Sequence, residues 1–123
     1  METTPVTITF PGAPEYLRLA RIATADAASR AGLDYEEIDD ARIAVSELCS
    51  LLSVDPSASI TLAFIVERGV LSVTGESVTG RATVAGNELS QAIIEAVVDE
   101  HTLGTDGDTT RFSITKRARA NAS

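Results

Sequence analysis

Two spacings of apolar residues alternate along the chain and predict two kinds of element. Stretches in which apolar and polar residues alternate predict strands over residues 6–10, 60–67, 70–76 and 109–116. Longer stretches with apolar residues at helical spacing predict helices over residues 15–31, 34–52 and 87–98. Only Arg68 and Gly69 separate the two middle strands, which is the spacing of a tight β-hairpin.

Residues that favour helix ends support these boundaries. Gly32 is a suitable C-terminal cap for the first helix, and Asp34 with Glu37 forms the capping-box pattern that opens the second. Residues 77–86 and 102–108 are rich in Gly, Thr and Asp and are expected to be loops, and residues 117–123 are expected to form a frayed, flexible tail. The order β-α-α-β-β-α-β predicts one α+β domain over residues 1–123. It is expected to be a two-layer sandwich whose mixed, mostly antiparallel sheet is covered on one face by about three helices.

The composition narrows the possible classes of protein. A chain of 123 residues has the length of one domain, and with no Trp and 4% aromatic residues its core must be mainly aliphatic. A single cysteine, Cys49, and a single histidine, His101, exclude an internal disulfide and a Cys- or His-rich metal site. Neither a signal sequence nor a membrane-spanning apolar run is recognisable, so we expect a cytoplasmic protein that does not enter a membrane.

The net charge of −8 bears on possible partners. With 18 acidic and 10 basic residues, the charge balance argues against a nucleic-acid-binding surface, which would need a basic patch to neutralise phosphates. The acidity suits a basic protein partner, or it simply keeps a small protein soluble. Four of the acids are close in sequence and are candidate partner-binding residues: Glu36, Glu37, Asp39 and Asp40. The same acids also suit the positive end of a helix dipole, so both interpretations stay open.

Four segments, taken in order, resemble one known family. They read FPGAPEYLRLAR, LDYEEIDDARIAVSELC, AIIEAVVDEHTL and GDTTRFSITKR, while LSVTGESVTG stands where the family has a glycine motif and departs from it. The chain resembles the RsbW-type anti-sigma factors of the Bergerat-fold (GHKL) ATPase and kinase superfamily. The resemblance implies a histidine-kinase-type ATPase fold, a homodimer, and a role in transcription regulation during stress. It also implies two protein partners, an alternative sigma factor and a STAS-type anti-anti-sigma protein.

The resemblance also implies where a nucleotide site would lie. Glu47 matches the family's catalytic Glu, and Ser50 matches a Thr of the same helix. The next family residue is an Asn that holds magnesium, and here it is Leu51. The alternative for Glu47, from the residue type alone, is a solvated helix acid or a structural partner of Arg42 or Arg18.

The two glycine motifs of the family are altered as well. The Asp that binds adenine falls near Gly75 or Glu76, and Glu76 is the candidate adenine ligand. Gly86 and Leu89 match the phosphate-binding motif, whose second Gly is here Glu88, a residue whose charge would repel a triphosphate. We therefore expect no cofactor, or else ATP bound without a clear magnesium ligand.

Two activities follow from the resemblance. The first is an anti-sigma-like binding module that sequesters an alternative sigma factor while its nucleotide site is eroded. The alternative is an ATP-dependent serine-protein kinase that phosphorylates the anti-anti-sigma protein. Phosphoryl transfer depends on positioning and on neutralisation of charge by metal, so the missing Asn and glycines favour the binding module.

Overall fold

The computed structural model describes residues 4–52, 57–78 and 88–119. The helices are α1 (Leu17–Arg30), α2 (Tyr35–Leu52) and α3 (Glu88–Val97), with a short 3-10 helix, η1 (Pro14–Tyr16), before α1. The strands are β1 (Val6–Pro11), β2 (Ser59–Glu67), β3 (Val70–Val78), β4 (Glu100–Asp106) and β5 (Thr109–Arg117). The chain is therefore an α+β protein, as its sequence predicts.

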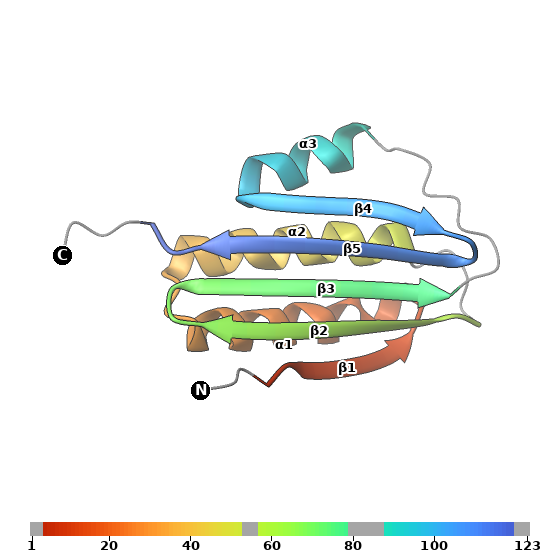
Figure 1. Cartoon of the computed structure of the whole chain (residues 1–123), viewed down its shortest axis with the longest axis horizontal. Coiled ribbons are helices and arrows are strands. Elements are labelled where there is room, and N and C mark those ends of the chain that lie inside the picture. The colour runs from red at the N-terminus through yellow and green to blue at the C-terminus, as the bar shows by residue number, and fades with distance from the viewer. Residues whose placement is uncertain (1–3, 53–56, 79–87, 120–123) are drawn as a thin grey trace.

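The five strands form one sheet in the order β1-β2-β3-β5-β4, and every neighbouring pair is antiparallel. Helices α1 and α2 lie side by side behind this sheet, and α3 lies next to β4 and against α2 (Figure 1). Because α1 contacts β2 while α2 contacts β5, each helix covers one half of the sheet. The predicted two-layer arrangement is confirmed.

Local sequence signals determine the connections. At the hairpin between β2 and β3, Gly69 has a φ of +78°, a backbone conformation that costs glycine little. After α1, Gly32 has a φ of +86°, and the Leu33 N–H donates to the carbonyl of Ala28 at 3.1 Å, so the helix ends in a Schellman-type turn. The predicted capping box is present, because the Glu37 N–H donates to Asp34 at 2.8 Å.

Small side chains bring the helix layer close to the sheet. In α1 the residues that face inward are Ala20, Thr24, Ala27 and Ala28, all at most 1% exposed. Large aliphatic and aromatic residues come from the strands and from α2, for example Leu48, Phe64 and Phe112. As expected for a chain without Trp, the core is mainly aliphatic.

Two expectations about the C-terminal third need correction. Residues 102–108 were expected to be a loop, but most of them belong to β4, an edge strand held by β5 and by a turn at Gly107, whose φ is +65°. The tail was expected to fray from Arg117. Instead, the Arg117 N–H donates to Asp99 at 2.7 Å and the Arg119 N–H donates to Glu37 at 2.5 Å. Of the expected loop at 77–86, Ser77 and Val78 belong to β3, and residues 79–86 lie outside the described residues, as do residues 120–123 of the tail.

Candidate functional site

Glu47 lies at the contact between α2 and α3. Glu47 is half-buried on a flank of α2, beside the apolar face that packs into the core. That buried apolar face consists of Ala41, Ala44, Val45, Leu48, Cys49 and Leu52. The carboxylate of Glu47 accepts a hydrogen bond from the hydroxyl of Ser90, in the first turn of α3, at 3.0 Å. The structure thus gives Glu47 a structural partner, although not the arginine that the sequence suggested.

The other residues of the predicted nucleotide site are distributed differently. Ser50 is exposed one turn after Glu47, whereas Leu51 is partly buried and packs against the core. Leu89 is 70% exposed, and Gly86 lies outside the described residues. The structure therefore brings Ser90, which the sequence analysis did not select, to the position beside Glu47.

Glu76 is not brought together with Glu47. Side chains alternate between the two faces of a strand, and the neighbours Gly75 and Ser77 are buried on the helix side. Glu76 consequently lies on the opposite face, where it pairs with Arg111 at 3.0 Å. The two carboxylates that the resemblance assigns to one site thus lie on opposite sides of the sheet.

An aromatic ring fills the space beside Gly75. A Cβ atom built on Gly75 would lie 2.3 Å from Phe112 and 2.9 Å from Leu62, which is far inside ordinary contact distance. Gly75 is therefore required by packing, because only a residue without a side chain lets the Phe112 ring of the neighbouring strand lie directly against the backbone of β3. Gly75 also falls near the position of the family's adenine-binding Asp, and a carboxylate has no room there.

The acidic residues at the start of α2 serve the fold to different degrees. Glu37 is only 2% exposed, and it accepts hydrogen bonds from the backbone N–H groups of Asp34, at 2.8 Å, and Arg119. Burial removes Glu37 from the proposed partner surface. Asp40 pairs with the largely buried Lys116 at 3.2 Å, while Glu36 and Asp39 are exposed and pair with arginines.

Basic and apolar side chains line two adjoining hollows between α1 and α2. The first, of about 250 Å³, lies beside Glu47 and includes Asp39, Ile43 and Ser46. The second, of about 360 Å³, includes Arg18 and Ile22, and both hollows include Arg21 and Arg42. Ile22 and Ile43 are 60% and 37% exposed. We call this set the arginine–isoleucine surface: Arg18, Arg21, Ile22, Arg42 and Ile43.

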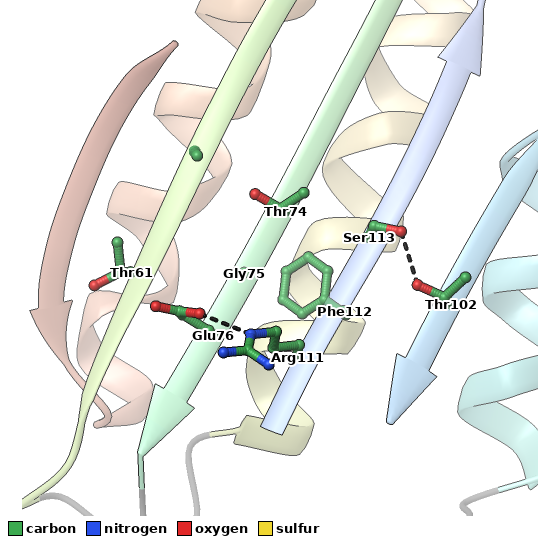
Figure 2. A pocket seen from close by; sticks show the side chains of 9 residues that line it. Thr61, Thr74, Gly75, Glu76, Thr102, Arg111, Phe112 and Ser113 are labelled. Carbon is green, nitrogen blue, oxygen red and sulfur yellow. Dashed lines mark hydrogen bonds and ion pairs between the residues drawn. The ribbon is translucent and has the colours of Figure 1, made fainter. Parts of the chain in front are cut away.

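The opposite face of the sheet carries a separate, shallow hollow of about 460 Å³ (Figure 2). Its lining is rich in short hydroxyl side chains, among them Thr61, Thr74 and Ser113, with the Glu76–Arg111 pair at one end. The hydroxyl groups of Thr102 and Ser113 share a hydrogen bond of 2.7 Å there. A polar, hydroxyl-bearing face is usual for an antiparallel sheet that is covered by helices on one side only.

Metal chemistry finds little support in the described part of the chain. Residues 4–52, 57–78 and 88–119 contain no group of three or more His, Cys, Asp or Glu residues placed to hold a metal ion. Cys49, a potential soft ligand, is buried, and this burial raises the pKa of its thiol to about 12.

Part of the chain is similar in sequence to known proteins. No family model matches the chain. The serine-protein kinase RsbW of Listeria monocytogenes serotype 4a is 50% identical over 42 residues, which are 34% of this chain and 27% of that protein. RsbW of Bacillus subtilis is 48% identical over 40 residues, 32% of this chain and 25% of that protein. The matches thus span about a quarter of the length of these curated relatives.

A solved structure extends the likeness of fold over nearly the whole chain. The structure of the RsbU and RsbW domains of Rv1364c from Mycobacterium tuberculosis matches with a TM-score of 0.70 and 20% identity, over 94% of this chain and 32% of that one. The comparisons support an RsbW-type family. Within residues 4–52, 57–78 and 88–119, no helix is long and apolar enough to cross a membrane.

Proposed function

We propose that this chain is an anti-sigma-type regulatory domain that binds an alternative sigma factor and has lost its nucleotide site. The observation that carries the proposal is the Phe112 ring, which fills the space beside Gly75 near the place of the adenine-binding Asp. The local similarity to RsbW supports an anti-sigma-type function. The Phe112 ring occupies the space that a carboxylate side chain at position 75 would need, and this argues against nucleotide binding.

The side chains around Glu47 do not fit a magnesium–nucleotide complex. Leu51, at the position of the magnesium-binding Asn, is apolar and packs against the core. The carboxylate of Glu47 is engaged by Ser90. Because phosphoryl transfer relies on a metal to neutralise developing charge, a site without that ligand is poorly equipped for the reaction.

The arginine–isoleucine surface is the partner-binding surface that the geometry favours. Its three arginines outnumber Asp39 and Glu47, the two acids that line the same hollows, so the area has a local excess of positive charge on a molecule whose net charge is −8. Exposed Ile22 and Ile43 add apolar area beside the cations. Interfaces commonly combine arginine with apolar anchors, and this one suits an acidic, amphipathic segment of the sigma factor. Exposed Glu36 and Asp39 remain candidates for contacts with basic residues of the partner.

A serine-protein kinase is the second candidate, and one observation favours it. Glu47 lines the hollow that also contains Arg21 and Ser46, so a hydroxyl group bound there would lie near a carboxylate. A carboxylate within hydrogen-bond reach of a hydroxyl can act as a general base. Such a role would require the Ser90 hydrogen bond to break or to be shared during the reaction.

Calorimetric titration separates the two candidates. The purified chain is titrated with ATP, with and without magnesium, and with the alternative sigma factors encoded in the same genome. We expect no heat and no thermal stabilisation with millimolar ATP, and saturable binding of one sigma factor. Magnesium-dependent ATP binding, followed by transfer of phosphate to a STAS-type anti-anti-sigma protein, would contradict the proposal and support the kinase.

Substitutions test whether the sigma factor binds at the arginine–isoleucine surface. Replacing Arg21 and Arg42 by Ala should weaken sigma-factor binding at least tenfold, because two basic contacts are lost from the centre of the surface. Arg111→Ala is the matched control, since this arginine is exposed on the opposite face of the sheet and also forms an ion pair. Equal effects of both variants would mean that the partner does not dock on the arginine–isoleucine surface.

A further inference from the structure

The larger of the two hollows between α1 and α2 is cationic. The described residues that line its volume of about 360 Å³ include three arginines and no acid: Arg18, Arg21, Ile22, Ala25 and Arg42. All but Arg42 belong to α1, so we call it the α1 hollow. Like charges in one hollow repel each other, and an anion that enters the hollow would remove this repulsion.

The three guanidinium groups retain most of their hydrogen-bond donors. Arg21 donates to the hydroxyl of Ser46 at 3.1 Å, and Arg42 contacts the carboxylate of Asp39 at 3.5 Å. Arg18 forms no hydrogen bond or ion pair with the described part of the chain. Because each guanidinium carries five N–H donors, the α1 hollow has many more donors than its surroundings use.

A phosphate group matches these donors better than a carboxylate does. A phosphate ester carries a charge of about −1.5 to −2 near neutral pH and has three strong acceptor oxygens. Arginine binds phosphate with two parallel N–H···O bonds, so three arginines can surround one phosphate group. Arg21 and Arg42 are half-buried and already held by their contacts, which lowers the entropy that is lost when a ligand binds.

The adjoining hollow, of about 250 Å³, contributes hydrogen-bond acceptors. Apart from the shared Arg21 and Arg42, its lining comes from α2, so we call it the α2 hollow; it consists of Asp39, Ile43, Ser46 and Glu47. Its carboxylates can accept hydrogen bonds from the hydroxyl groups of a ligand, but they repel a phosphate. A phosphate is therefore favoured in the α1 hollow and a neutral, hydroxyl-bearing group in the α2 hollow.

From these features we propose that the paired hollows bind the phosphate ester of a small polyol, for example a sugar phosphate. The phosphate lies among Arg18, Arg21 and Arg42, and the hydroxyl groups face Asp39 and Ser46. Together the hollows reach the size usual for a small-ligand site, about 300–1,000 Å³. The ligand would cover part of the arginine–isoleucine surface and so compete with the sigma factor, a consequence that rests on the proposed function.

Titration of the chain alone tests the site without any protein partner. Glycerol phosphate, ribose phosphate, inorganic phosphate and glycerol are added separately at constant ionic strength, and binding is followed by calorimetry and by NMR shifts. We expect saturable binding of both esters, weaker binding of inorganic phosphate and none of glycerol. Absence of saturable binding by every phosphate compound at millimolar concentration overturns the proposal. Esters that bind no more tightly than inorganic phosphate overturn the part that concerns the polyol.

Substitution of one arginine locates the phosphate. Arg18→Gln should weaken binding of the esters about tenfold, because one charge-assisted contact is lost. Arg30→Gln is the matched control, since this arginine is also exposed on α1 but pairs with Asp26 and lines neither hollow. Thermal melting establishes that both variants fold. Equal weakening by the two substitutions would show that only the overall charge matters, and this would overturn the site.

Substitution of one acid locates the polyol. Asp39→Ala removes an acceptor from the α2 hollow and frees Arg42 from its ion pair. It should therefore strengthen binding of inorganic phosphate and reduce the preference for glycerol phosphate over inorganic phosphate. An unchanged preference would overturn the placement of the hydroxyl groups beside Asp39.

Competition with the sigma factor tests the regulatory consequence. Glycerol phosphate should weaken the complex of the chain with its sigma factor, and the Arg18→Gln chain should require about tenfold more of the ester for the same effect. A ligand that binds without weakening the complex overturns the competition and leaves the ligand site in place. Sigma-factor binding by a chain that binds no phosphate compound overturns the ligand site and leaves the proposed function in place.

Discussion

The hydroxyl of Ser90 donates a hydrogen bond of 3.0 Å to the carboxylate of Glu47 and thereby joins the first turn of α3 to α2. This contact gives a definite role to a carboxylate that resembles a catalytic residue. Since α3 contacts the sheet mainly through β4 and through Lys116 of β5, which donates to the Val97 carbonyl at 2.7 Å, its position depends largely on α2. Glu47 is therefore, first of all, an anchor for α3.

A double-mutant cycle measures that role. Ser90→Ala should lower the free energy of unfolding by about 1–2 kcal/mol, because a half-buried carboxylate loses a hydrogen-bond donor. Glu47→Ala should cost a similar amount, and the double variant should cost less than the sum. Glu47→Gln is the control, since its amide oxygen can still accept from Ser90. Urea unfolding supplies the energies, and additive effects would show that the contact does not couple the helices.

The close approach of Phe112 to Gly75 gives a second prediction. Gly75→Ala should destabilise the fold by about 1–3 kcal/mol, because the new methyl group overlaps the Phe112 ring and Leu62. Shortening the neighbour with Phe112→Leu should recover part of that loss in the double variant. Gly104→Ala serves as the control, since a Cβ there meets nothing within 4 Å and should be close to neutral. Thermal unfolding that ranks the two glycine variants equally would contradict this packing.

Local patterns determined most of the elements that the sequence predicted correctly. The alternation in β2 and β3, the turn at Gly69 and the cap formed by Asp34 and Glu37 depend on residues close in sequence. Strand β4 could not be found in this way. Its residues include Gly104 and Asp106, which disfavour strands, and only its pairing with β5 makes the segment extended.

At the candidate site, contacts between residues far apart in sequence limited how much could be predicted from the sequence. Glu37 resembles an ordinary surface acid until the C-terminal segment, 82 residues later, reaches its carboxylate. Ser90 gives no local signal of its contact with Glu47, because that contact requires α3 to lie against α2. Period-two alternation along β3 would have placed Glu76 on the opposite face from Gly75, and this signal was available in the sequence.

The buried Glu37 carboxylate gives a third prediction. Its two oxygens accept from the backbone of Asp34 and of Arg119, and a Gln side chain would turn an N–H₂ group toward one of these donors. Glu37→Gln should therefore lower the free energy of unfolding by about 1–3 kcal/mol and speed hydrogen exchange at Arg119. Glu36→Gln, which removes only an exposed ion pair with the same arginine, should cost less than about 1 kcal/mol. Equal losses of unfolding free energy in the two variants would mean that the buried hydrogen bonds of Glu37 add no more stability than the exposed ion pair of Glu36.

Burial of Cys49 predicts how stability changes at high pH. Its thiol has a pKa of about 12 in the folded chain, against 9.0 for an unhindered thiol, because burial disfavours the thiolate. Below pH 9 both states hold the proton and the group adds no pH dependence. Between pH 9 and about 12 only the unfolded state loses the proton, so stability falls as the pH rises, by up to about 1.4 kcal/mol per pH unit.

The variant Cys49→Ala isolates this effect from the titration of Tyr and Lys side chains. It should be less stable than the parent at pH 7, because the removed sulfur leaves a small cavity. The difference between the two chains should then shrink as the pH rises above 9, since only the parent loses stability through the thiol. Urea unfolding at pH 7, 9, 10 and 11 measures this difference. A difference that stays constant over the series would show that the thiol ionises as readily in the folded chain as in the unfolded one, which would contradict its burial.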